Sequence, residues 1–389
     1  MYEAKLFIDL EYTFKHALNH EVVYASLLHD PRRALHGQIV AAIERLYADR
    51  LSEHGDRLAH RAFRGEMWEK ALHYLREMGS SESQPSIDAF MGGAESAGHR
   101  WFRGEYERAL VLALRERGFA ASFANFGWTI LSNYRLGQIY HSLGDYPKAT
   151  EALTRTVTLL EGDLKRQRFE MAGLPAVLAR VWLAFCAAEC GNAREAAALT
   201  EEATAIAEAE DHAYSLVIAH AGTGMLRNLE GNHEGAIGPL ERGLVTVRLF
   251  DIPFLFPLIA APLGRAYALT GRMEEGLRFL QDAVQRAEDM QWAANHPLRI
   301  VWLGESYVLA GDASAGRRLG TRALELARRL GERGHEAYAL RLLGQIAASG
   351  PAPDLEQASA YYLEGLALAK TLGMQPLAAA LASSLPSPR

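Results

Sequence analysis

Cysteine is nearly absent from the 389-residue sequence, which contains only Cys186 and Cys190. The two thiols lie four residues apart on one predicted helix, so they offer neither a disulfide framework nor the Cys/His spacing of a zinc site. We therefore predict that both are small core residues of a protein in a reducing compartment, the cytoplasm.

Long apolar runs and an excess of positive charge are also missing. The most apolar stretch, residues 252–263, contains three prolines and is shorter than the roughly 18 residues that a membrane-spanning helix needs. The first residues lack the basic start, apolar run and cleavage site of a secretion signal. The formal net charge is −6, which argues against a nucleic-acid partner and against anionic membrane surfaces.

Catalytic motifs form a third absence. The sequence contains no G-x-S-x-G nucleophile elbow, no H-E-x-x-H zinc motif and no G-x-x-x-x-G-K-[ST] phosphate loop. His16 and His20 have a spacing that two metal ligands could share, but no third ligand lies nearby in sequence, so we expect a structural role for them. We predict a non-enzymatic protein with no metal and no cofactor.

Glycine does recur at a regular interval along the sequence. Residues 136–149, LGQIYHSLGDYPKA, read as a helix, a tight turn at Gly144 and a second helix. Equivalent turn glycines are Gly104, Gly144, Gly191, Gly231, Gly271 and Gly311. Their interval is 40 residues, except for 47 between the second and third, where residues 162–175 either lengthen the helices or form a loop. Such a period over most of a chain indicates stacked helical units.

The pattern of Leu-Gly, an aromatic residue, Gly and Ala resembles the tetratricopeptide repeat (TPR). LGRAYALTG (residues 263–271) and LGESYVLAG (residues 303–311) show it again. The resemblance implies an all-α fold, a TPR-like right-handed α-solenoid in which helix pairs form a superhelix. The usual unit has about 34 residues, so a 40-residue spacing implies longer helices or turns. We expect an array of about seven repeats over residues 87–376 and a C-terminal tail over residues 377–389.

Residues 1–80 differ from the array. Apolar residues at helical spacing from residue 14 to 22 and again from 35 to 46, with Asp30-Pro31 between them, predict two amphipathic helices. A third helix is predicted over residues 57–78. An unpaired apolar face in this segment would favour self-association of the chain.

The order F-K-H-A-L, E-V-x-Y-x-S-L-L and R-R-x-L-H in residues 14–36 resembles the winged-helix end of the ATPase portion of bacterial adenylate/guanylate cyclases and related signalling ATPases. Those proteins carry a C-terminal TPR array. The resemblance implies that the chain is similar to their sensor or regulatory arm, and that His16 would meet a nucleotide only in trans, because this chain has neither a phosphate loop nor a cyclase domain.

Stacked repeats place equivalent residues in columns along the inner, concave surface. The columns, together with the neighbouring His141, give these candidate partner-binding residues: Tyr134, Gln138, His141, Phe185, Met225, Arg265, Glu305, Arg341 and Gln345. Such a mixed strip would suit a peptide or an extended protein segment. We therefore predict a protein- or peptide-binding scaffold or regulatory module acting through its groove.

Two alternatives remain open for the groove. Arg265 and Glu305 could simply pair on a solvated surface, where an ion pair contributes at most about 1 kcal/mol. The groove could instead receive a small molecule. The six tryptophans are predicted to pack between helices rather than to stack on bases.

Overall fold

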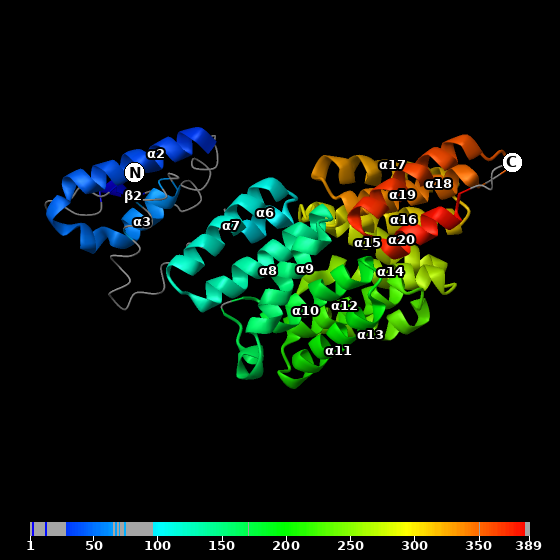
Figure 1. Cartoon of the computed structure of the whole chain (residues 1–389), viewed down its shortest axis with the longest axis horizontal. Coiled ribbons are helices and arrows are strands. Elements are labelled where there is room, and N and C mark those ends of the chain that lie inside the picture. Colours follow the sequence, from blue (N-terminus) through cyan, green and yellow to red (C-terminus); the bar gives the residue numbers. More distant parts are fainter. Residues whose placement is uncertain are drawn as a thin grey trace. The chain divides into compact units, whose positions relative to one another are not determined.

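The structure, a computed structural model, describes residues 2–3, 12–13, 29–64, 67, 70, 74, 96–169, 171–349 and 351–385. The chain divides into two compact units, Met1–Gly93 and Ala94–Arg389, which we call unit 1 and unit 2 (Figure 1).

Within its described residues, unit 1 contains a short antiparallel pair of strands and two α-helices. Its elements are β1 (Tyr2–Glu3), β2 (Tyr12–Thr13), α2 (His29–Leu46), η1 (Ala48–His54) and α3 (Gly55–Arg64). Val40 and Ile43 of α2 are buried, as are Leu58 and Ala62 of α3. Helix α2 includes the predicted Asp30-Pro31 start. The helix predicted over residues 14–22 and the pair His16 and His20 lie outside the described residues.

Unit 2 is a succession of seven helix pairs followed by a single helix, counted over the residues that the structure describes. Consecutive helices pack against each other, as expected for an α-solenoid. The helices are α6 (Ala97–Phe102), α7 (Tyr106–Ser122), α8 (Phe126–Leu143), α9 (Tyr146–Leu159), α10 (Pro175–Glu189), α11 (Ala193–Ala209), α12 (Ala213–Leu229), α13 (His233–Leu249), α14 (Phe256–Leu269), α15 (Met273–Asp289), α16 (His296–Leu309), α17 (Ala313–Leu330), α18 (Arg333–Ala348), α19 (Leu355–Leu372) and α20 (Gln375–Ser383), with 3₁₀ turns η2 (Gly162–Arg166) and η3 (Pro253–Leu255).

The regularly spaced glycines are confirmed at the turn within each of the six helix pairs from α6 to α17. All six predicted turn glycines have positive φ, between 74° and 90°, a conformation that side chains with a Cβ disfavour. In several turns the next residue caps the following helix: the Asp145 carboxylate accepts from Lys148 N and the Asp312 carboxylate from Ala315 N. The 47-residue interval contains η2 and the loop before Pro175, so the added residues form a loop.

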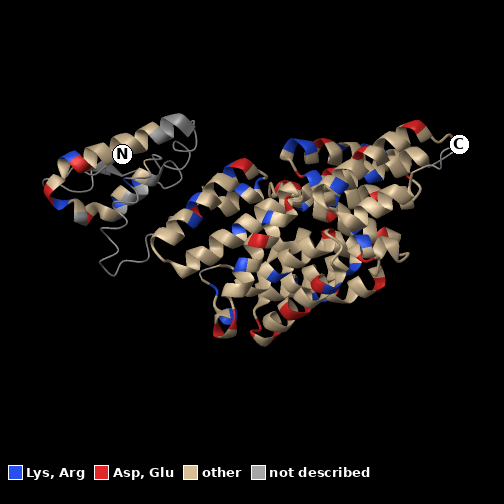
Figure 2. Ribbon diagram, viewed as in Figure 1, with Lys and Arg blue, Asp and Glu red and all other residues tan. Residues whose placement is uncertain are grey.

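The two helices of a pair differ in character. Helices α10, α12 and α14 carry few charges and are buried over most of their length, whereas α11 and α15 are rich in Glu and Arg and bury only one face. Figure 2 shows this contrast as ribbons that are mostly tan beside ribbons that carry red and blue. The first helix of each pair therefore faces the inside of the solenoid. Among the described residues, no helix is both long and apolar enough to cross a membrane.

Small residues let the two helices of a pair approach closely. A Cβ atom at Gly264 of α14 would lie 2.7 Å from the carbonyl oxygen of Gly276 and 2.9 Å from the backbone nitrogen of Leu280, both on α15. Backbone atoms cannot turn aside as a flexible side chain can. We expect Gly264→Ala to lower the free energy of unfolding by about 2 to 3 kcal/mol through overpacking, measured by urea denaturation.

Gly118 of α7 provides the matched control for this substitution. It is also a helical glycine, but a Cβ atom there would meet nothing within 4 Å. Gly118→Ala should therefore be neutral or raise the free energy of unfolding by up to about 1 kcal/mol, because alanine favours helix. Equal effects of the two substitutions would contradict the close approach of α14 and α15.

The later helices of the solenoid pack on its first ones. The backbone nitrogens of Ala293 and Ala294, before α16, donate to the carbonyl oxygen of Phe102 at 2.9 and 3.2 Å. Helix α8 contacts α18, and α10 contacts α20. We call this contact between helices α6–α10 and segments α15–α20 the seam.

Candidate functional site

The seam and the inner helices enclose a pocket that we call the aromatic pocket. Its cavity volume is about 70 Å³, inside about 720 Å³ of open space that includes its mouth and the solvent there. Its walls come from α6, α8, α10, α12, α14, α16 and α18 and from the loop before α16. The lining residues are Trp101, His141, Trp182, Phe185, Glu189, Met225, Leu229, Pro257, Leu258, Ala261, Pro262, Trp292, Asn295, Leu298, Arg299, Trp302 and His335.

Three of the predicted groove residues, His141, Phe185 and Met225, line this pocket together. His141 is 8% exposed, and neither of its ring nitrogens has a hydrogen-bond partner. Its ring stands edge to face against Trp182, with centroids 5.0 Å apart. Burial, with a smaller contribution from His335, lowers the pKa of His141 to about 3, so the ring is neutral at pH 7 and offers one donor and one acceptor.

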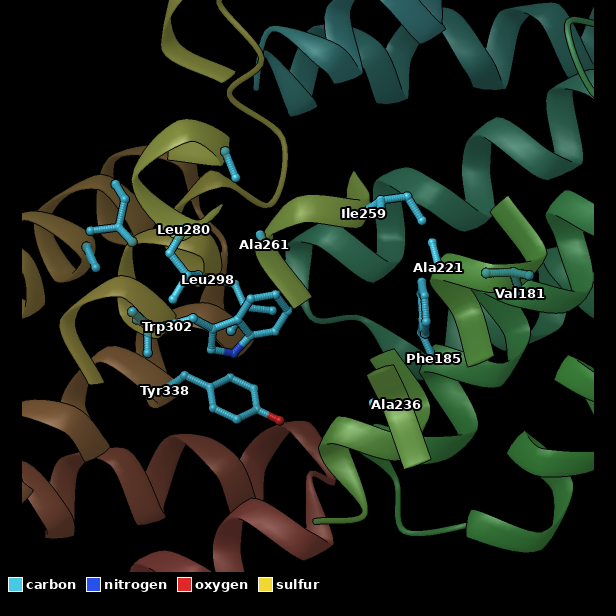
Figure 3. Packing of buried hydrophobic residues seen from close by; sticks show 14 of the residues in the cluster. Val181, Phe185, Ala221, Ala236, Ile259, Ala261, Leu280, Leu298, Trp302 and Tyr338 are labelled. Carbon is cyan, nitrogen blue, oxygen red and sulfur yellow. The ribbon is translucent and has the colours of Figure 1, made fainter. Parts of the chain in front are cut away.

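Four of the tryptophans predicted to pack between helices do so, and they also border this pocket. Trp101, Trp182, Trp292 and Trp302 all line the aromatic pocket. Trp182 and Trp302 lie three residues before the predicted column positions Phe185 and Glu305, hence on the same helix face. This spacing is a sequence signal that could have found them. Figure 3 shows Trp302 beside Leu298 and Ala261, facing the inside of the solenoid.

A second hollow, which we call the charged pocket, adjoins the first and shares Glu189, Leu229 and Trp302 with it. It contains about 910 Å³ of space, including its mouth. The predicted residues Arg265 and Arg341 line it, and Leu377 of α20 forms part of its wall. Residues 377–383, which the sequence analysis assigns to a tail, thus belong to a helix that borders the inner surface.

Glu305 joins the two arginines of the charged pocket. Its carboxylate accepts from Arg265 Nε at 3.2 Å and from Arg341 Nη2 at 2.5 Å. The side chains of Arg265 and Glu305 are both only 13% exposed, so the alternative of a pair on a solvated surface is wrong. Burial would raise the pKa of Glu305, but the two guanidinium groups outweigh it and the pKa is lowered. Removing one partner of such a buried network is costly.

The remaining predicted residues lie elsewhere. Tyr134 and Gln138 are buried in α8, where Arg135 stacks over the Tyr134 ring and donates to Gln138 Oε1 at 2.8 Å. Gln345 is exposed on α18. None of the three lines either pocket. The columns predicted from the repeat spacing therefore bring together only some of the candidate partner-binding residues.

Glu189 belongs to both pockets and to the seam, and the sequence analysis did not identify it. Its carboxylate accepts from the hydroxyl of Tyr338, with oxygen distances of 3.0 and 3.2 Å; Figure 3 shows this hydroxyl pointing toward the earlier helices. Burial raises the pKa of Glu189 to about 7, although the Tyr338 hydrogen bond, His335 and Arg341 all act to lower it.

The parts of the chain that the structure describes contain no group of three His, Cys, Asp or Glu side chains placed to hold a metal ion. Cys186 is buried and Cys190 half-buried, both as free thiols, and burial raises the pKa of each. The chemistry available at the inner surface is therefore apolar contact, hydrogen bonding and charge pairing.

The comparison with curated proteins found no match. Among solved structures, a Rap protein complexed with Competence and Sporulation Factor is similar at a TM-score of 0.57 and 12% identity, over 89% of this chain and 99% of that chain. A Signal Transduction ATPase with Numerous Domains (STAND) that has a tetratricopeptide repeat sensor, from Pyrococcus horikoshii, gives a TM-score of 0.48 and 15% identity, over 85% of this chain and 50% of that chain.

The family comparison matches one segment of unit 2. Residues 131–159, which cover α9 and most of α8, match the tetratricopeptide repeat. The surrounding helix pairs continue the same arrangement, with a turn glycine of positive φ in each of the pairs from α6 to α17. Residues 131–159 thus form a tetratricopeptide repeat, and the helix pairs of unit 2 around it form an α-solenoid.

Proposed function

We propose that the chain is a non-enzymatic regulatory scaffold that binds a peptide or an extended protein segment along the concave surface of unit 2. The observation that carries the proposal is the pair of adjoining hollows on that surface, one aromatic and one charged, which share Glu189, Leu229 and Trp302. An apolar cavity beside a polar one suits a segment that inserts a side chain and hydrogen-bonds next to it.

Two further observations support the proposal. The helices that form the walls are held by close packing within each pair and by the seam, so the surface is formed before a partner arrives and little ordering entropy opposes binding. The Rap structure with the same fold was solved in complex with Competence and Sporulation Factor, which gives a precedent for ligand binding on this fold.

Selection of random displayed peptides against the purified full chain tests the proposal. Enriched peptides should bind with one-to-one stoichiometry in fluorescence anisotropy. Met225→Glu, which places a charge in the aromatic pocket, should weaken that binding at least tenfold, because a carboxylate cannot be buried there without a partner. Hydrogen exchange should slow in α10, α12, α14 and α16 when the peptide binds.

Val245→Glu is the matched control. Val245 is an exposed apolar residue of the outer helix α13, and the same new charge there should change affinity by less than about twofold. A selection that enriches no peptide, or peptides that bind both variants equally well, would refute the groove as the binding surface.

A second candidate function is that of a C-terminal sensor arm of a larger cyclase- or STAND-type signalling protein, acting in the cytoplasm. Two observations favour it: unit 1 forms a compact unit of its own before the array, and its sequence resembles the winged-helix end of such ATPases. The mass of the native protein, detected in its source cells with an antibody against unit 2, decides between them. A mass well above the 42.9 kDa of this chain favours the sensor arm.

A further inference from the structure

The aromatic pocket contains hydrogen-bonding groups that no described residue satisfies. Both ring nitrogens of His141 and the indole Nε1 of Trp292 are buried without a partner, and the two side chains are 8% and 7% exposed. Leaving a buried polar group unpaired is unfavourable, and native proteins rarely do so without a functional reason. Both residues line the same apolar cavity, which points to a ligand as the missing partner.

The unsatisfied groups are mainly donors. The indole N–H of Trp292 can only donate, and the neutral His141 ring has one N–H. Arg299, also in the lining and 5% exposed, uses Nη1 to donate to the Ala294 carbonyl at 3.1 Å and stacks over the Trp292 ring at 4.5 Å. It makes no ion pair within 4.0 Å with any described residue. Donors and a buried guanidinium favour an anionic acceptor.

The rest of the cavity favours a ring system. Trp182 and Phe185 meet edge to face at 5.7 Å, and Trp101 and Trp182 do so at 5.6 Å, so ring faces and edges surround the space. Aromatic ligands gain from such offset and edge-to-face contacts beyond the burial of apolar area. The less buried wall residues, among them Trp182 and Met225, give the pocket its contact with solvent.

We infer that the aromatic pocket binds a small aromatic acid, meaning one or two rings joined to a carboxylate, offered by a free molecule or by the C-terminal residue of a bound peptide. The rings fill the space between the tryptophans, and the carboxylate accepts from the donors of His141, Trp292 and Arg299. For its peptide source the inference rests on the proposed function; for the free acid it does not.

Calorimetric titration of the full chain with indole-3-acetate, and in parallel with its neutral analogue indole-3-acetamide, tests the inference. The acid should bind saturably at one site, at least tenfold more tightly than the amide, because only the acid offers an anion to the donors. A second arm compares a short peptide ending in a tryptophan carboxylate with the same peptide amidated at its C-terminus, and shows which source is preferred.

Conservative variants locate the site. His141→Phe keeps an aromatic ring but removes both unpaired nitrogens, so it should weaken binding of the acid at least tenfold without lowering the melting temperature of the free protein. Trp292→Phe removes one donor and should weaken it about fivefold. Trp128→Phe is the matched control, because Trp128 is buried in α8 but does not line the pocket, and it should leave affinity within about twofold.

The outcomes separate this inference from the proposed function. The inference is overturned if neither the acid nor the free-carboxylate peptide binds at millimolar concentration, if acid and amide bind equally, or if His141→Phe has no effect; displayed peptides that Met225→Glu still blocks would then leave the proposed function standing. Binding of the free acid alone, with no displayed peptide enriched, supports the inference and rejects the peptide-binding function.

Discussion

Glu332→Ala is expected to lower the free energy of unfolding of the protein by about 3 to 5 kcal/mol, because it removes a fully buried hydrogen-bond acceptor at the seam. Glu332 is 0% exposed. Its carboxylate accepts from the Tyr106 hydroxyl, from the backbone nitrogen of Asn295 at 2.9 Å and from Nδ1 of His335 at 2.6 Å. These donors come from three separate segments, so one substitution leaves three buried groups without an acceptor.

The position of Glu332 makes the loss specific to the seam. Tyr106 begins α7, near the start of unit 2, whereas Glu332 precedes α18. Their hydrogen bond therefore joins the first helices of unit 2 to its later ones. Glu332→Ala should lower the free energy of unfolding measured by urea denaturation. It should also raise the radius of gyration measured by small-angle X-ray scattering, since the first and the later helices of unit 2 can then separate. The whole free energy of unfolding of a typical protein is only about 5 to 15 kcal/mol, so the effect is readily measured.

Glu325→Ala serves as the control for the loss of a carboxylate. Glu325 is exposed on the outer helix α17, and its replacement should change the free energy of unfolding by less than about 0.5 kcal/mol. A change below about 1 kcal/mol for Glu332→Ala, or an unchanged radius of gyration, would mean that the buried carboxylate does not hold the seam.

The local structure of the array was predictable because its determinants are local. A glycine with positive φ followed by Asp or Asn fixes a turn and a helix start within two residues, as Gly144 and Asp145 do. The 40-residue spacing of these signals then specifies helix pairs. The same reasoning could not choose between a loop and longer helices for residues 162–175, because both satisfy the spacing.

The seam could not be predicted, because it depends on the accumulated curvature of the solenoid. Each unit rotates slightly relative to the one before, and only the sum over several units decides that α18 meets α8. One partner of each buried carboxylate is therefore distant in sequence: Tyr106 lies 226 residues from Glu332, and Tyr338 lies 149 residues from Glu189. The columns predicted from the repeat spacing failed for Gln345 for the same reason, since it is exposed on α18 whereas Gln138 is buried in α8.

Glu189 gives the second large effect, a stability that depends on pH near neutrality. Its pKa of about 7 in the folded protein is higher than the value near 4.3 of an unfolded chain, because burial disfavours the charged carboxylate. A raised pKa means that the folded state binds the proton more tightly, so this contribution is fully present below about pH 4.3 and is lost as the pH rises through 7.

Glu189→Gln should remove this pH dependence. The amide stays neutral, and its oxygen can still accept from the Tyr338 hydroxyl. Relative to the unsubstituted protein, the variant should gain about 2 to 3 kcal/mol in free energy of unfolding between pH 5 and pH 8, measured by urea denaturation at each pH. Both proteins retain the neighbouring His335, Arg341 and Tyr338, so the difference between them reports the substitution at position 189.

Glu201→Gln, on the exposed face of α11, is the matched control and should follow the unsubstituted protein at every pH. A Glu189→Gln variant that does the same would show that Glu189 is ionised throughout this range.

Because Glu189 lines both pockets, its ionisation adds a negative charge to the concave surface as the pH rises. An anionic ligand of the aromatic pocket should therefore bind more tightly at pH 6 than at pH 8, and Glu189→Gln should reduce that difference.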